Sequence, residues 1–142
     1  MTTNDSKHIR AKVTKTKKEN VQLTTLTFDI SLEAKPGQFV MCWIPPDNEK
    51  PMSIANDSPL QISVANAGPT SKKISELKIG DYLYIRGPYG KPFLQKGKKW
   101  LMVGGGYGFA PLRFMAKQGI KQKFEVHSIL GARSKEDRKS VV

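Results

Sequence analysis

The sequence predicts a mainly β protein: a six-stranded antiparallel Greek-key barrel over residues 1–95, then an incomplete Rossmann-like α/β unit over residues 96–142. The first indication is that short apolar stretches rich in β-branched residues alternate with turn signals from residue 8 to residue 90. The second is that a strand, a glycine run, a helix and another strand follow Phe93. A parallel sheet of two strands cannot cover both of its faces, so we expect the second unit to be unfinished.

The barrel strands are predicted where alternating apolar residues end at a turn signal. Residues 21–30 alternate with a one-residue slip at Thr24–Thr25, which predicts a bulge or a bend where the strand changes sheets. Lys35-Pro36-Gly37 and Asp57-Ser58-Pro59 are turn signals, and Gly87-Pro88-Tyr89-Gly90 is expected to end the last strand. We expect strands over residues 8–18, 21–30, 38–44, 52–56, 60–66 and 81–86, and a helix over residues 71–77.

The second unit is predicted from the stretch Leu101–Leu112, which reads LMVGGGYGFAPL. It contains a hydrophobic strand, four glycines and the start of a helix, with Pro111 in the first turn of that helix. Gly119 is expected to follow the last helical residue as a C′ glycine. We expect strands over residues 100–103 and 124–130 and a helix over residues 107–118.

Composition is typical of a globular protein with a strongly basic surface. The chain has 142 residues, with 24 lysines and arginines against 12 acidic residues and a net charge of +12. A solvated lysine-rich surface explains this charge better than nucleic-acid binding, because no zinc-finger spacing or RNA-binding aromatic motif accompanies the lysines. No apolar run approaches the roughly 18–20 residues that span a bilayer, and the polar N-terminus resembles no secretory signal. We therefore expect a cytoplasmic protein that makes no membrane contact.

Few residues are candidates for side-chain catalysis, and we predict no catalytic residue. Cys42 is the only cysteine, so the sequence excludes an internal disulfide and a cysteine-only metal or iron–sulfur site within this chain. Cys42 lies between Met41 and Trp43 and is expected in the core. His8 and His127 are isolated, and His127 is expected as a packed or edge residue of its strand.

Six segments in order resemble the ferredoxin–NADP reductase superfamily. The resemblance is closest to the electron-transfer subunit family of dihydroorotate dehydrogenase and to the flavin subunits of archaeal sulfhydrogenases and sulfide dehydrogenases. It covers nearly all of residues 8–137 and implies an FAD-binding barrel in front of a nicotinamide-binding domain. The segments are PGQFV (36–40), KPMSIAN (50–56), GPTSKKISELKIGD (68–81), RGPYGKPF (86–93), GGGYGFAPL (104–112) and LGARSKED (130–137).

The resemblance implies that Lys50, Pro51, Met52 and Ser53 contact FAD, with Ile54 continuing the strand past the ring. Many relatives have arginine in place of Lys50, and lysine supplies the charge without the planar two-pronged donor. Met52 stands where many relatives have tyrosine and offers a softer contact than ring stacking. An ordinary barrel strand is the alternative interpretation of Met52 and Ser53.

Two further segments are implied to contact the flavin. Val64, Ala65 and Asn66 correspond to the segment beside the ribityl chain in relatives. Residues 68–71 correspond to the loop that holds the FAD phosphates, which implies contacts from Gly68, Thr70 and Ser71. The alternative interpretation is that Ser71 simply caps the following helix through its hydroxyl, and both roles are compatible.

The glycine run is implied to hold the diphosphate of NAD(P)H. Glycines let the backbone approach a ligand closely, and a helix N-terminus favours an anion. Arg133 is expected either to meet the adenosine ribose or its phosphate, or to be a solvated arginine in a charged tail. The implied contacts are Gly104, Gly105, Gly106, Gly108, Ala110 and Pro111.

The implied activity is that of a flavoprotein subunit that passes electrons from NAD(P)H through FAD to a partner subunit. Relatives carry further strands after the position of Asp137, and the dihydroorotate branch has a four-cysteine iron–sulfur cluster that this chain lacks. We therefore interpret the chain as a fragment, a split gene product or a naturally shortened form. It is expected to perform either the first part of this electron transfer or the flavin binding alone. A catalytic partner subunit or a homodimer is expected. The alternatives are a basic β-barrel module that binds nucleic acid and a structural subunit without a cofactor.

Overall fold

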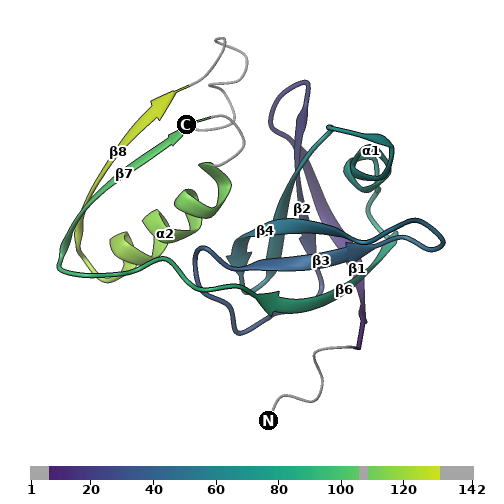
Figure 1. The fold of residues 1–142 in the computed structure, drawn as a ribbon, viewed down its shortest axis with the longest axis horizontal. Coiled ribbons are helices and arrows are strands. Elements are labelled where there is room, and N and C mark those ends of the chain that lie inside the picture. The colour runs from purple at the N-terminus through teal and green to yellow at the C-terminus, as the bar shows by residue number, and fades with distance from the viewer. Residues whose placement is uncertain (1–6, 106–108, 132–142) are drawn as a thin grey trace.

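The computed structural model describes residues 7–105 and 109–131, with no description of the side chain of Phe109. Two parts lie beside each other, a barrel and a smaller α/β unit (Figure 1). The elements of the barrel are β1 (Ile9–Lys18), β2 (Leu23–Phe28), β3 (Phe39–Trp43), β4 (Lys50–Asp57), β5 (Leu60–Ala65), α1 (Pro69–Ser75) and β6 (Tyr82–Tyr89). The elements of the α/β unit are β7 (Lys99–Gly105), α2 (Phe109–Lys121) and β8 (Glu125–Gly131).

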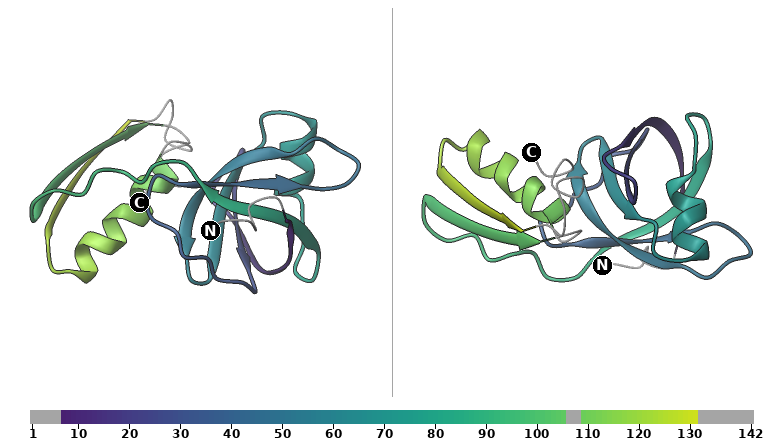
Figure 2. Two further views of the ribbon diagram at one scale, coloured as in Figure 1. Left: turned by 60° about the horizontal axis from the view of Figure 1, so that its bottom comes forward. Right: turned by 90° about the horizontal axis from the view of Figure 1, so that it is seen from above.

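The first six strands form a closed barrel in the order β1-β2-β5-β4-β3-β6, and every pairing is antiparallel. This confirms the predicted six-stranded barrel. Figure 2 shows the strands curving around one interior, with α1 beside the barrel at the end away from the α/β unit. Closure leaves no barrel strand with an unpaired edge.

Alternate residues of each strand fill the barrel interior. Phe28, Leu26, Ile54, Ile62 and Leu83 are among the largest side chains that are fully buried there. Burying a side chain of this size contributes about 1.5–3 kcal/mol relative to leaving it exposed. The period-2 alternation that predicted the strands therefore also sets which residues form the core.

The strand irregularity lies in β1, one strand away from the predicted bulge. The pairing of β1 with β2 shifts between Val13 and Lys15, whereas Thr24 and Thr25 pair with β5 without interruption. Thr25 is buried and donates its hydroxyl to Glu19 Oε1 at 2.9 Å, but it pairs with Ser63 on the face of β2 opposite to the core residues Leu26 and Phe28. The predicted bulge at Thr24–Thr25 is wrong. The apolar pattern changes phase there because Leu23 is buried on the outward face of β2, whereas Leu26 and Phe28 fill the barrel core.

Strand β6 continues three residues past its predicted end. Tyr89 pairs with Phe39 of β3, so the segment from Gly87 to Tyr89 belongs to the strand. Gly87 has a φ of 131°, a conformation that favours glycine, and this lets the strand bend and continue. Gly87 and Pro88, which were expected to end the strand, therefore lie within it.

Helix α1 begins two residues earlier than predicted, and its N-cap is Gly68 with no side-chain capping hydrogen bond. The prediction that Ser71 caps the helix is therefore wrong. The Ser71 hydroxyl donates to the Gly68 carbonyl at 3.2 Å and accepts the Ala67 N–H at 3.1 Å, which stabilises the turn into the helix. Ile74 is fully buried in the barrel core cluster and holds α1 against the barrel.

The α/β unit has the predicted strand–helix–strand order, with β7 and β8 parallel and in register from Lys99↔Glu125 to Gly105↔Gly131. Met115 of α2 packs on Trp100 and Met102 of β7 in a second hydrophobic cluster. Pro111 lies in the first turn of α2, as predicted. Neither helix of the described parts is long and apolar enough to cross a membrane. The domain boundary at residue 95 stays a prediction.

Helix α2 also packs against the barrel. Phe114 is 1% exposed and lies in the same core cluster as the barrel residues, so α2 packs on two hydrophobic clusters at once. Arg113 adds an ion pair to Glu19 at 3.7 Å. These contacts attach the α/β unit to the barrel.

Gly119 lies inside α2, because the helix continues to Lys121. Lys123, two residues after the last helical residue, has a positive φ of 63°. The prediction of a C′ glycine at residue 119 is therefore wrong. A Cβ on Gly119 would lie 2.7 Å from Trp100 Cζ3 and 2.8 Å from Val126 Cγ2. Glycine at this position lets the helix approach the sheet closely.

Replacing Gly119 with alanine is expected to destabilise the protein by about 1–2 kcal/mol. Overpacking against Trp100 and Val126 costs about 1–3 kcal/mol and outweighs the gain in helix propensity of about 1 kcal/mol. Chemical denaturation of the variant measures the change in the free energy of unfolding. The matched control is Gly131→Ala, because a Cβ there meets no atom within 4 Å. Equal stability of the two variants would contradict the packing argument.

Candidate functional site

A pocket of about 420 Å³ opens between β4, β5, α1 and the first turn of α2. Its volume is in the range of small-molecule sites. Strand β4 supplies one wall, the β5–α1 segment supplies the other, and Ala110 of α2 closes one side. The lining residues are Lys50, Pro51, Met52, Ser53, Ser63, Ala65, Ala67, Gly68, Pro69, Thr70, Ser71 and Ala110.

The pocket combines an apolar wall with one cation and a few hydroxyls. Pro51, Met52 and Ala65 offer apolar surface, while Lys50 offers an ammonium group at the mouth. Among the described residues, Lys50 has no ion-pair partner, and the hydroxyls of Ser53 and Thr70 make no hydrogen bond. These groups are therefore available to a flat, partly apolar ligand that carries negative charge.

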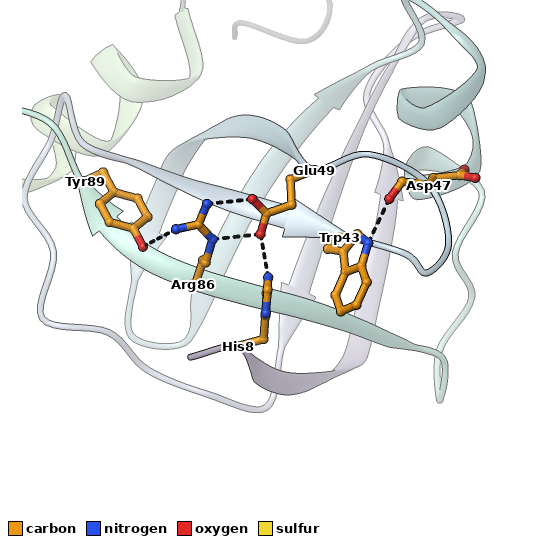
Figure 3. A network of polar contacts seen from close by, with 6 residues as sticks. All are labelled: His8, Trp43, Asp47, Glu49, Arg86 and Tyr89. Atoms are coloured by element: carbon orange, nitrogen blue, oxygen red, sulfur yellow. Dashed lines mark hydrogen bonds and ion pairs between the residues drawn. The ribbon is translucent and has the colours of Figure 1, made fainter. Parts of the chain in front are cut away.

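An ion-pair network holds the start of β4, where Lys50 lies (Figure 3). Arg86 donates from Nε and Nη2 to the two carboxylate oxygens of Glu49, at 2.7 and 2.6 Å. His8 Nε2 lies 2.5 Å from the same carboxylate, and Arg86 also donates to the Tyr89 hydroxyl at 3.0 Å. The network joins the residue before β1, the residue before β4 and strand β6. It therefore positions Lys50, the residue that follows Glu49.

The network has a defined charge state. The hydrogen bonds from Arg86 lower the pKa of Glu49 from 4.5 to about 2, with burial opposing the shift and His8 adding to it. The same hydrogen bond with Glu49 raises the pKa of Arg86 above its usual range. Glu49 is therefore ionised and Arg86 charged at neutral pH, and Glu49 occupies this arginine's guanidinium. Lys50 is left as the cation that faces the pocket.

The free energy of unfolding is expected to fall as the pH drops from about 4.5 to about 2. Over this range the Glu49 carboxylate takes up a proton in the unfolded chain but stays ionised in the folded one, so the stabilisation that its depressed pKa provides is lost. Glu49→Gln should lower stability at neutral pH and make this acid-side fall shallower. Thermal unfolding at a series of pH values measures both effects. Glu76→Gln is the control, because Glu76 is exposed and makes no ion pair among the described residues. Identical pH profiles for the two variants would contradict the role of the network.

The pocket brings together half of the residues predicted to bind a cofactor. Lys50 to Ser53, Ala65, Gly68, Thr70, Ser71 and Ala110 line it. Ile54 and Val64 are fully buried in the barrel core, so a ligand contact from them would have to come from the backbone. Asn66 is exposed beside the pocket, and its N–H donates to the Gln22 carbonyl at 2.8 Å. All of these contacts with a cofactor stay predictions.

The predicted dinucleotide loop is described only in part. Gly104 and Gly105 end β7, and Pro111 is buried in α2, but none of the three lines the pocket. Gly106, Gly108 and Arg133 lie outside the described residues. Ala110 is the residue that connects this segment with the pocket.

The remaining candidates behave mostly as structural residues. Cys42 is fully buried, and burial raises the pKa of its thiol, so the thiol stays protonated. His127 is exposed on β8, which within the described ranges pairs only with β7, so it agrees with the edge alternative, and its ring lies 2.6 Å from Glu125 Oε1. His8 packs on the ring of Trp43 at 4.9 Å and belongs to the network. No group of His, Cys, Asp and Glu within the described ranges could hold a metal ion.

Sequence reasoning missed three residues of the pocket, Ser63, Ala67 and Pro69. Ser63 lies on β5, where every second residue faces outward, so its parity with Ala65 could have indicated it. Ala67 and Pro69 flank Gly68 in the turn before α1. The network residues Glu49 and Arg86 were also missed, because the two are 37 positions apart.

No protein-family model matches the chain. Curated relatives named "Probable dihydroorotate dehydrogenase B (NAD(+)), electron transfer subunit" do match it. The relative from Thermococcus kodakarensis is 44% identical over 110 residues, which cover 78% of this chain and 46% of the relative. The relative from Methanocaldococcus jannaschii is 42% identical over 119 residues, covering 84% of this chain and 46% of the relative. The chain thus spans about half the length of the curated relatives it matches.

Solved structures of reductases superpose on this chain. An NADH-dependent reduced ferredoxin-NADP oxidoreductase superposes with a TM-score of 0.79 at 27% identity, covering 93% of this chain and 50% of that protein. Phthalate dioxygenase reductase superposes with a TM-score of 0.80 at 19% identity, covering 92% and 44%, which is a likeness of fold alone. The barrel and the strand–helix–strand unit thus occur together in these proteins.

Proposed function

We propose that this chain is a ferredoxin–NADP reductase-like flavoprotein that binds FAD and transfers electrons from NAD(P)H to a partner subunit, because the curated proteins that match it are named dihydroorotate dehydrogenase B electron transfer subunits. The observation that carries the proposal is the pocket, where Lys50, Ser53 and Thr70 border an apolar wall. Within the described ranges, Lys50 has no ion-pair partner and the two hydroxyls make no hydrogen bond. FAD has the matching features, a flat ring system and a charged diphosphate. The pocket residues therefore fit this cofactor.

The roles proposed for the pocket residues follow from their chemistry. Pro51, Met52 and Ala65 would contact the flat ring and exclude water from it. Ser53 would donate a hydrogen bond to a ring acceptor, since its hydroxyl has no partner among the described residues. Lys50 and Thr70 would hold the diphosphate. Ser71 contributes to the wall through its turn, because its hydroxyl proton is already given to the Gly68 carbonyl.

The proposed nicotinamide site involves Ala110 and the glycines before it. Bound FAD supplies the redox chemistry, taking up a hydride and releasing electrons singly. The chain's own contribution would be to hold NAD(P)H at the start of α2, which borders the flavin pocket through Ala110. The names of the curated relatives, electron transfer subunits, support a catalytic partner subunit that receives the electrons.

FAD uptake by the purified chain tests the first part of this proposal. The protein is incubated with FAD, passed through gel filtration and examined by visible absorption. We expect a flavin band in the protein fractions and an affinity for FAD that is at least tenfold higher than for riboflavin, which lacks the phosphates. A colourless protein that takes up no added FAD would overturn the proposal. Salt-dependent binding of oligonucleotides by the colourless protein would then favour the nucleic-acid alternative.

Bleaching of bound flavin tests the second part. Under anaerobic conditions, NADH and NADPH are added separately to the FAD-loaded protein. Loss of the flavin band with either nucleotide would support the proposed nicotinamide site. A stable flavin band with both nucleotides would limit the chain to flavin binding.

A further inference from the structure

The hydroxyl of Ser63 lies in the wall of the flavin pocket and also belongs to a chain of polar contacts that runs away from the pocket. Ser63 faces outward from β5, since its neighbours Ile62 and Val64 fill the barrel core. On the next strand, Thr25 of β2 pairs with Ser63, and their hydroxyl oxygens are 3.1 Å apart. Thr25 in turn donates to Glu19 Oε1 at 2.9 Å. We call these three side chains the hydroxyl relay.

Glu19 fixes the direction of the hydrogen bonds in the hydroxyl relay. Its side chain is only 6% exposed, and its carboxylate oxygens lie 3.5 Å from Lys17 Nζ and 3.7 Å from Arg113 Nη1. A carboxylate held between two cations accepts hydrogen bonds and donates none, so the Thr25 hydroxyl gives it its one proton. Thr25 can then only accept from Ser63, which makes Ser63 the donor of the 3.1 Å contact.

The one proton of the Ser63 hydroxyl is therefore directed away from the pocket, and only the lone pairs of its oxygen are left for a ligand. Ser53, which lines the same pocket from β4, differs in this respect. Within the described ranges its hydroxyl makes no hydrogen bond, so it can rotate to donate or to accept. The diphosphate of FAD offers only acceptor oxygens at neutral pH, so it forms no hydrogen bond with Ser63.

We propose that Ser63 accepts a hydrogen bond from a donor of the bound flavin, either a ribityl hydroxyl or the N–H of the ring, and that Thr25 and Glu19 are the positioning residues that hold Ser63 as an acceptor. The inference rests on the proposed FAD binding. It gives the cofactor a direction in the pocket, with a donor group at β5 and the diphosphate at Lys50 and Thr70.

The test measures the Kd of the full chain by flavin fluorescence for FAD, for FAD analogues that each lack one ribityl hydroxyl, and for FAD methylated at the N3 nitrogen of the ring. Ser63→Ala should weaken FAD binding about 3- to 10-fold, the usual effect of losing one uncharged hydrogen bond. One analogue should bind the parent protein and Ser63→Ala equally, because it lacks the donor that Ser63 meets. That analogue identifies the donor as a ribityl hydroxyl or the ring N–H.

Thr25→Val removes the acceptor of the Ser63 proton but leaves Ser63 in place. The freed hydroxyl can rotate and is no longer polarised by the hydroxyl relay, so the preference for FAD over the identified analogue should fall by about 2- to 5-fold. Thr25→Ser keeps the hydroxyl and should restore the preference. The matched control is Thr27→Val, which should leave it unchanged. Thr27 is also buried on the outward face of β2, but it accepts from Gln61, which does not line the pocket.

Equal weakening of every flavin by Ser63→Ala would overturn the inference, because a merely structural effect does not distinguish between the analogues. An unchanged preference in Thr25→Val, or the same loss in Thr27→Val, would overturn the positioning role of the relay. In each of these cases FAD still binds, so the proposed function stands. Ser63 is partly exposed at the pocket wall, so its truncation should leave the protein folded. A parent protein that takes up no FAD would overturn both proposals.

Discussion

Replacing Phe114 with alanine is expected to lower the free energy of unfolding by about 3–5 kcal/mol, the usual cost of removing a buried phenylalanine. Phe114 is 1% exposed and comes from α2, yet it lies in the core cluster of the barrel. Its loss leaves a cavity between the barrel and the helix. Since a small domain is stable by only about 5–15 kcal/mol, the loss is a large part of the total.

The Phe114 variant should also weaken ligand binding in the flavin pocket. Ala110 lies one helical turn before Phe114 and forms the α2 wall of that pocket. Chemical denaturation measures the stability change, and an FAD titration at low denaturant measures the affinity of the molecules that remain folded. Ile120→Ala is the control on the same helix, because Ile120 is 66% exposed and its truncation should change stability by no more than about 0.5 kcal/mol. Similar stability of the two variants would contradict the attachment of α2 to the barrel.

Replacing Lys50 with glutamate is expected to weaken FAD binding by about 10- to 100-fold. A hydrogen bond to a charged group contributes about 1.5–3 kcal/mol, and each 1.4 kcal/mol changes the affinity tenfold. Lys50 is exposed at the pocket mouth and has no ion-pair partner within the described ranges, so its loss leaves no unpaired charge in the protein. The stability of the variant should therefore remain close to that of the parent protein.

Two further variants make the Lys50 experiment specific. Lys50→Arg should bind FAD at least as tightly as the parent protein, because the guanidinium offers two parallel donors. Lys15→Glu changes the same net charge on the outer face of β1 and should leave the affinity within about twofold. A Lys50→Glu protein that binds FAD like the Lys15→Glu protein would show that Lys50 does not hold the diphosphate.

Sequence patterns predicted the barrel well, and the errors have local physical causes. Thr25 was interpreted as part of a bulge, because the buried Leu23 lies on the outward face of β2 while Leu26 lies on the inward face, which resembles a slip in the pattern. Gly119 was interpreted as a helix end, because the sequence does not show the Trp100 ring that requires the glycine. Ser71 was interpreted as a helix cap, although its hydroxyl bonds the backbone of Ala67 and Gly68, in the turn before the helix.

By itself, the sequence determined the order and type of the elements, because alternation and turn residues act over a few neighbouring positions. It also placed Met52 and Ser53 on one strand, with Lys50 two residues before it, whereas the structure extends the strand to Lys50. Only the tertiary structure decided which surfaces meet: the pairing of Glu49 with Arg86, the entry of Phe114 into the barrel core and the meeting of Ala110 with β4. These contacts join residues far apart along the chain, and such contacts depend on how the strands close and the helix packs rather than on any local pattern.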